Sequence, residues 1–113
     1  PNMTFLKTLL AEPLSPELRA YVDYARVEHR IGGTEVSGIH VFNHFMRAWG
    51  HQFIYDAAGL GALFERGGFT AVAECPLNGS EHERLRGLAK TDRMPAGFLE
   101  MESVAMEGRK PRP

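Results

Sequence analysis

The chain has 113 residues, 43% of them hydrophobic and 24% charged, the profile of a single domain over residues 1–113 with a real core and no room for two. Its formal net charge of −1 argues against nucleic acid and against an anionic membrane as partners. One cysteine excludes an internal disulfide and, with no apolar run of transmembrane length and no secretory signal pattern, favours a cytoplasmic protein.

The first part of the chain is predicted to be helical. Apolar residues on one face predict a helix over residues 4–10, which Pro13 stops. Ser15 and Pro16 then favour the start of a second helix, because serine caps free amides and proline fits the first helical position. The glycine pair Gly32–Gly33 is its expected end.

A third helix is predicted over residues 38–49, followed by a stop at Gly50 and a short extended link over residues 52–55. Four apolar side chains recur in it at i, i+3, i+4 and i+7, which places them on one face toward a core. This stripe comprises Phe42, Phe45, Met46 and Trp49.

The remainder, residues 55–110, is predicted to form a helix, a strand, a loop and a strand. Asp56 is a suitable N-cap for a helix to residue 66, whose inward side chains are Leu60, Leu63 and Phe64. Alternating side chains predict strands over residues 69–75 and 98–107, with a short helix over residues 81–88 between them. Cys75 is expected to be a buried, inert thiol, because no basic residue flanks it to stabilise a thiolate.

The fold class that follows is α+β, with about four helices followed by a two-stranded antiparallel edge pair. Two strands bury little apolar surface by themselves and leave edges open to further pairing. We therefore expect either a homo-oligomer, in which the chain acts as a non-enzymatic structural or interaction module, or a piece of a larger sheet.

Candidate site residues gather near the end of the third helix. His51 and Tyr55 lie in a non-helical link, where functional side chains are over-represented, and Arg47 is suited to bind a carboxylate or phosphate through two hydrogen bonds. Each also has a purely structural explanation. His51 can bond a backbone carbonyl, Tyr55 can pack at a helix entrance, and Arg47 can be a solvated charge at a helix end.

A metal site is a third possibility. His40 and His44 are four residues apart on the third helix, and His51 follows shortly, so imidazoles can share one face. No acidic residue lies between the first two, so the HExxH pattern of metalloproteases is absent. A small histidine-based metal-binding domain remains an alternative to the two readings above.

The segment Tyr55-Asp56-x-x-x-Leu60-x-x-Leu63-Phe64-x-x-x-Gly68-Phe69-x-x-Val72 resembles the C-terminal part of class I, S-adenosylmethionine-dependent methyltransferases, and the nearest group looks like the type 11 branch. The opening Pro1-Asn2-Met3-Thr4-Phe5-Leu6 is similar to the segment that follows the fifth strand of that fold. The resemblance therefore spans essentially the whole chain.

This resemblance implies a Rossmann-like sheet of which residues 69–75 and 98–107 would be the antiparallel edge pair, with residues 1–54 as a helical cap over the substrate pocket. It implies His51 as a base or orienting group, and an acceptor site lined or supported by His44, Arg47, Trp49 and Tyr55. The glycine-rich loop and the acidic ribose ligand of the family have no counterpart here. We therefore expect a substrate-side fragment, inactive alone and without its own S-adenosylmethionine site, whose parent methylates an unidentified small molecule.

Overall fold

The computed structural model describes residues 1–32 and 37–112, which form an α+β chain of two compact units. The helical unit comprises Met3–Ile54 together with Pro1, and the strand unit runs from Tyr55 onward together with Asn2. The division falls between residues 54 and 55, the position at which the sequence pattern changes from helices to helix, strand and loop. Gly33 lies outside the described residues.

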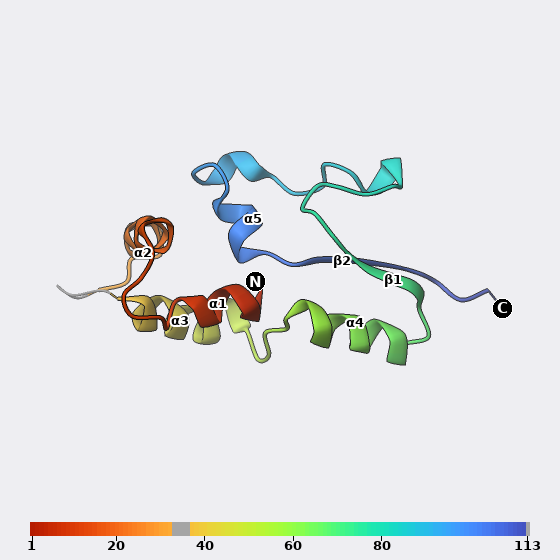
Figure 1. Cartoon of the computed structure of the whole chain (residues 1–113), viewed down its shortest axis with the longest axis horizontal. Coiled ribbons are helices and arrows are strands. Elements are labelled where there is room, and N and C mark those ends of the chain that lie inside the picture. Colours follow the sequence, from red (N-terminus) through yellow and green to blue (C-terminus); the bar gives the residue numbers. More distant parts are fainter. Residues whose placement is uncertain (33–36, 113) are drawn as a thin grey trace. The chain divides into compact units, whose positions relative to one another are not determined.

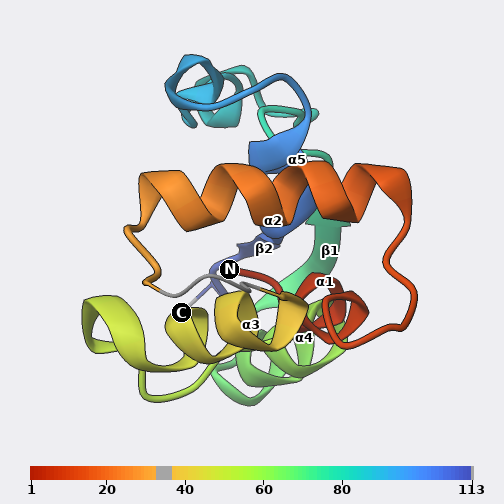
Figure 2. The same ribbon diagram turned by 90° about the vertical axis from the view of Figure 1, so that its left-hand side faces the viewer.

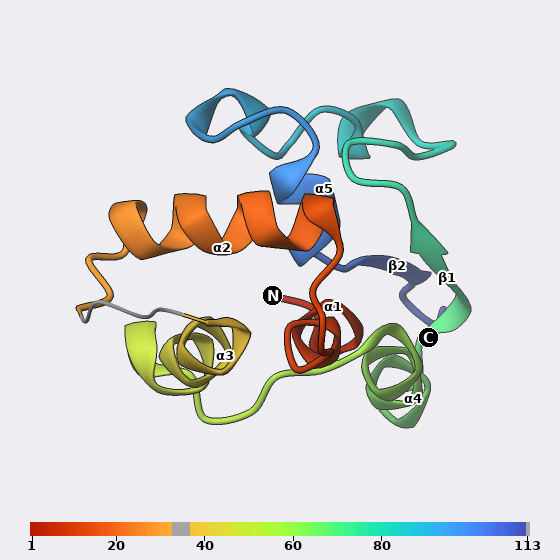
Figure 3. The ribbon, with the colours of Figure 1, turned by 60° about the vertical axis from the view of Figure 1, so that its left-hand side comes forward.

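The described residues of the helical unit form three α-helices and one 3₁₀-turn. They are α1 (Met3–Thr8), α2 (Pro16–Glu28), α3 (Gly38–Arg47) and η1 (Ala48–Gly50). Figures 2 and 3 show α2 lying across both α1 and α3, and Figure 1 shows that the axes of α1 and α3 are roughly aligned with opposite chain directions. The start of α2 is as predicted, because Pro16 opens it and the Ser15 hydroxyl accepts a hydrogen bond from the Leu18 amide at 3.2 Å.

The end of α2 comes earlier than predicted. The helix stops at Glu28, and Arg30 takes a left-handed conformation with φ of 52°. The Ile31 amide donates to the Arg26 carbonyl at 3.0 Å and the Arg30 amide donates to the Val27 carbonyl at 3.3 Å. This pair of bonds is a Schellman motif, in which an arginine occupies the position that glycine usually takes.

The buried side chains of the helical unit come from all three helices and from the link after η1. They are Phe5, Leu6, Leu9, Tyr21, Val22, Ala25, Val41, Phe45 and Ile54. The buried residues of α3 are Gly38, Val41 and Phe45, so the predicted stripe is rotated about the helix axis. Trp49 was expected to face a core but is 60% exposed, because α3 ends two residues before it.

The strand unit combines helices with one two-stranded sheet. Its elements are α4 (Ala57–Arg66), β1 (Thr70–Cys75), η2 (Glu83–Leu85), η3 (Thr91–Arg93), α5 (Phe98–Glu102) and β2 (Ala105–Arg109). The two strands pair antiparallel, with Cys75 opposite Ala105 and Thr70 opposite Arg109. In Figure 1, α4 lies along one side of this pair and the segment from η2 to η3 lies on the other.

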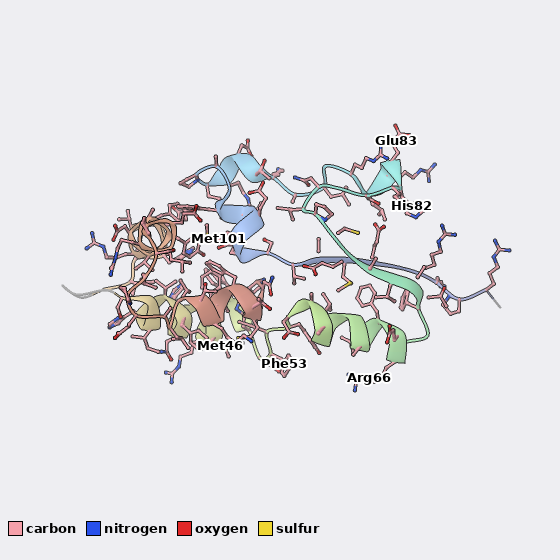
Figure 4. All side chains as sticks on the ribbon, viewed as in Figure 1. Met46, Phe53, Arg66, His82, Glu83 and Met101 are labelled. Carbon is pink, nitrogen blue, oxygen red and sulfur yellow. The ribbon has the colours of Figure 1, made fainter. Side chains whose placement is uncertain are left out.

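The prediction for α4 is largely confirmed. The Asp56 carboxylate accepts a hydrogen bond from the Gly59 amide at 2.7 Å and so caps the first turn. Leu60 and Phe64 are half-buried, whereas Leu63, which was expected inward, is 38% exposed. Figure 4 shows Arg66 projecting from α4 away from the strands.

The second predicted strand, residues 98–107, is wrong in its first half. Residues Phe98–Glu102 form α5, and β2 begins only at Ala105. Leucine, glutamate and methionine are good helix formers, and a left-handed Gly97 with φ of 83° turns the chain into this helix. The buried Leu99 therefore lies on a helix, so the expected alternation of side chains does not begin there.

Strand β1 also departs from simple alternation. The register is irregular between Thr70 and Ala73, and Ala71 between them is left-handed with φ of 50°. Such a bulge reverses the side-chain order, so Val72 is half-buried while Ala71 and Ala73 are exposed. The short helix predicted over residues 81–88 is reduced to the single turn η2.

Within the described part of the chain, no helix combines the length and the apolar character needed to cross a membrane.

Candidate functional site

The site region begins where α3 ends. Trp49 and Gly50 are both left-handed, with φ of 55° and 75°, and together they reverse the chain direction within η1. Glycine adopts this conformation readily, but a bulky residue such as tryptophan does so only under strain. The reversal brings His51 back beside the last turn of α3.

His51 is held at the end of α3 by one short hydrogen bond. Its Nδ1 lies 2.6 Å from the Phe45 carbonyl oxygen. A carbonyl has no proton to give, so Nδ1 must be the donor and the neutral ring keeps its lone pair on Nε2. The bond serves one of the carbonyls that a helix end leaves without an intrahelical partner, and it also leaves His51 with a basic nitrogen.

Four rings gather around Trp49, and we call the five together the Trp49 cluster. Four partners lie with ring centroids 5.0 to 5.6 Å from the indole: His44 at 5.0 Å, His29 at 5.1 Å, Phe45 at 5.5 Å and His51 at 5.6 Å. His29 and His44 stack on one another at 5.2 Å with an interplanar angle of 16°. The edge-on geometry around the indole is a favourable arrangement for aromatic rings.

The sequence reasoning missed His29 as a member of this cluster. It lies at the C-cap of α2, fifteen positions before His44, and its position in the sequence carries no signal of a site. Only the packing of α2 against α3 brings the two imidazoles together. The only signal in the sequence is that His29 lies near the expected end of a helix, where a histidine interacts favourably with the helix dipole.

Arg47 and His44 meet on a second surface next to the cluster. Both line a shallow groove of about 630 Å³ along the exposed side of α3, together with His40 and Asn43. His44 therefore belongs to both features, since its ring contacts Trp49 and also borders the groove. Four of the five predicted site residues, namely His44, Arg47, Trp49 and His51, are thus neighbours in the helical unit.

Tyr55 is the first residue of the strand unit, whereas the other four residues lie in the helical unit. It packs at the start of α4, where its Cδ1 lies 3.4 Å from the place that a Cβ on Gly59 would occupy. This location matches the structural explanation for Tyr55, packing at a helix entrance.

The metal reading receives no support from the geometry. His40 Nδ1 accepts a hydrogen bond from the Ser37 amide at 3.1 Å, so this nitrogen serves the start of α3. Over residues 1–32 and 37–112, no three or more histidine, cysteine, aspartate or glutamate side chains are placed to hold a metal ion.

A second hollow, of about 480 Å³, lies in the strand unit between the two strands and the segment around η2. Glu107 is half-buried there and accepts a hydrogen bond from the Ser80 hydroxyl at 2.7 Å. Partial burial, a hydrogen bond to Glu107 and the charges of Glu107 and Glu81 raise the pKa of the nearby Cys75 thiol. A raised pKa disfavours the thiolate, which agrees with an inert cysteine.

Comparisons with protein-family models, with curated proteins and with solved structures found no match for this chain.

Proposed function

We propose that this chain is the C-terminal, substrate-side part of a class I S-adenosylmethionine-dependent methyltransferase. In this proposal the strand unit is the edge of a Rossmann-like sheet, and the helical unit is the cap that binds the methyl acceptor. The parent enzyme would act on a small molecule, and the chain alone would be inactive.

The observation that carries this proposal is the order and pairing of α4, β1 and β2. The resembling sequence segment runs from the cap of α4 into β1, and β2 pairs antiparallel with β1 while α4 packs against both. The family sheet ends in such an antiparallel pair. Among residues 1–32 and 37–112 the sheet has only these two strands, so β2 has an outer edge suited to pairing with a further strand.

The chemistry assigned to the helical unit is acceptor binding and proton removal. S-adenosylmethionine supplies an electrophilic methyl group when bound, but the chain carries no motif for it, and no residue here is assigned to the cofactor. His51 would accept the acceptor's proton at Nε2, because its Nδ1 proton is committed to the Phe45 carbonyl. Arg47 would orient the acceptor, which is the main contribution that binding makes to a methyl transfer.

The coding DNA upstream of Pro1 tests the parentage. We expect an in-frame strand followed by a glycine-rich loop, and then an acidic residue at the end of a second strand. An upstream frame that lacks these features contradicts the proposal. Calorimetry of the isolated chain with S-adenosylmethionine should show no stoichiometric binding, and clear binding would contradict the absence of a cofactor site.

The protein encoded by the whole frame then tests the role of His51. With tritiated S-adenosylmethionine and pooled small-molecule acceptors, His51→Ala should lower methyl transfer by about 100-fold, the usual size of a general-base effect. His82→Ala is the matched control, because His82 is an exposed histidine of the strand unit. Equal activity in the two variants would remove His51 from the chemistry.

A homo-oligomer is the second candidate function, and the strand unit favours it. Phe69, Leu85 and Leu88 of the strand unit expose 38%, 44% and 71% of their surface, and Phe69 directly precedes β1. A second copy of the chain would bury such surface and pair with the outer edge of β2. Sedimentation velocity at low micromolar concentration should show a dimer or larger species, whereas a well-folded monomer argues against this candidate.

A further inference from the structure

The groove along α3 has a composition that the proposed function does not by itself explain. Its polar residues are His40, Asn43, His44 and Arg47, and its apolar residues include Ile31 and Ile39. None of the described residues that line it is acidic. The polar residues are spaced three and four apart, so they follow one face of the helix over about 10 Å.

Two of these side chains present hydrogen-bond donors in a defined way. His40 Nδ1 accepts the Ser37 amide proton, so the neutral ring carries its own proton on Nε2 and is a donor at that position. The Asn43 amide donates one proton to the Ile39 carbonyl at 2.9 Å, which fixes the orientation of the amide and leaves it a second N–H.

Arg47 adds a permanent positive charge at the end of this row. Its guanidinium has a planar fork of donors that matches the two oxygens of a carboxylate or phosphate. A cation at a helix end is also favoured by the helix dipole. The helix dipole explains Arg47 alone. It gives no reason for the donors of Asn43, one turn earlier, and of His40, two turns earlier.

We propose that this groove binds the oxyanion group of the methyl acceptor, a small molecule that carries a carboxylate or a phosphate. The identification of the ligand as a methyl acceptor rests on the proposed function, whereas the anion site itself involves only residues of the helical unit. Arg47 makes the bidentate contact, while His40 and Asn43 donate to the remaining oxygens. The ring of His44 borders the groove and contacts Trp49, which in turn contacts His51, so the site is connected to the candidate base by packed rings.

The test uses the isolated chain with ¹⁵N labelling, titrated with malonate in one series and inorganic phosphate in another, at constant ionic strength. We expect saturable shifts of the Arg47 side-chain N–H signals and of the α3 backbone amides. The anion that binds more tightly identifies the oxyanion class. Arg47→Gln should raise the dissociation constant by about tenfold, since a charge-assisted bidentate contact is lost. Arg47→Lys keeps the charge but lacks the planar fork of donors, so its dissociation constant should lie between those of the unchanged chain and Arg47→Gln.

Arg26→Gln is the matched control, because Arg26 is an exposed arginine of the same unit that does not line the groove. The Arg26→Gln variant should bind the anion with the same dissociation constant as the unchanged chain. Non-saturating shifts, or equal losses in the Arg26 and Arg47 variants, would overturn the site. If the anions bind but the upstream frame encodes no cofactor loop, the methyltransferase proposal is rejected and the anion site stands. If the frame encodes a cofactor loop but the anions do not bind, the anion site is rejected and the methyltransferase proposal stands.

Discussion

The backbone of Gly38 lies directly against the carbonyl group of Leu9. A Cβ placed on Gly38 would lie 1.7 Å from the Leu9 carbonyl oxygen and 2.7 Å from its carbonyl carbon. No real side chain tolerates such distances, and the obstructing atoms are backbone rather than the end of a flexible side chain. The first turn of α3 can therefore approach the segment after α1 only because residue 38 is a glycine.

Replacing Gly38 with alanine should destabilise the helical unit by about 3 kcal/mol, the upper part of the range for overpacking a buried position. Urea unfolding followed by far-UV circular dichroism measures the change. Gly32→Ala is the matched control, because a Cβ at Gly32 would meet nothing within 4 Å and its φ is not in the left-handed region. Similar stabilities for the two variants would show that α3 moves away from Leu9 without cost.

The hydrogen bond from His51 to the Phe45 carbonyl should contribute to stability as well as to function. His51→Phe keeps an aromatic ring beside Trp49 but removes the donor, and it should cost about 1 kcal/mol. His51→Ala removes both and should cost about 1 kcal/mol more, since the ring contact is also lost. Thermal unfolding distinguishes the variants, and His82→Ala should change little. If His51→Phe is as stable as the original chain, the hydrogen bond from His51 to the Phe45 carbonyl does not contribute to stability.

Asn78 closes the loop between β1 and α5. Its side-chain amide donates to the Ala89 carbonyl at 3.1 Å and its carbonyl accepts from the Ala89 amide at 2.7 Å, while its backbone is left-handed with φ of 63°. The Asn78 backbone carbonyl also accepts from Gly87 at 3.2 Å.

Asn78→Gly should therefore keep the backbone conformation and lose the side-chain bonds, whereas Asn78→Ala should lose both. We expect amide exchange at Ala89 to accelerate in both variants, and exchange at Gly87 to accelerate mainly in the alanine variant. The cost should be about 2 kcal/mol for the two side-chain bonds and about 1 kcal/mol more for an alanine at positive φ. Unchanged exchange at Ala89 in the glycine variant would contradict the role of the side chain.

Cys75 should alkylate slowly. A raised pKa leaves a smaller fraction of thiolate at any given pH, and the thiolate is the reactive form. The rate of reaction with iodoacetamide should therefore rise with a midpoint above the ordinary thiol value of about 8.5. Glu107→Gln removes a negative charge beside the sulfur and should shift the midpoint downward, with Glu74→Gln as the neighbouring control. A midpoint at the ordinary value in the unchanged chain would contradict this picture.

Local signals in the sequence predicted the features that depend on a few neighbouring residues. The caps at Ser15 and Asp56 are of this kind, because each side chain bonds an amide three residues further on. The predicted end of α2 was wrong because Arg30 takes a left-handed conformation, which an arginine rarely adopts. The start of β2 was misjudged because Gly97 turns the chain into α5 instead of a strand.

The candidate site shows the same division between local and distant contacts. Arg47 and His51 lie close together in the sequence, and their neighbourhood at the end of α3 was predictable. His29 was not, since its contact with His44 depends on the packing of α2 against α3. Tyr55 was grouped with His51 because both lie in the link after the third helix, and the boundary between the two units falls directly before Tyr55.

Trp49 gives the protein a spectroscopic reporter of its own. It is the only tryptophan in the chain, it belongs to the helical unit, and its indole is surrounded by three imidazoles and a phenyl ring. Intrinsic fluorescence excited at the indole band therefore senses events in the helical unit and contains no tryptophan signal from the strand unit. The unfolding transition measured by tryptophan fluorescence can be compared with the transition measured by total helical content. Coincident transitions would show that the two units unfold together, and separate transitions would show that they unfold one at a time.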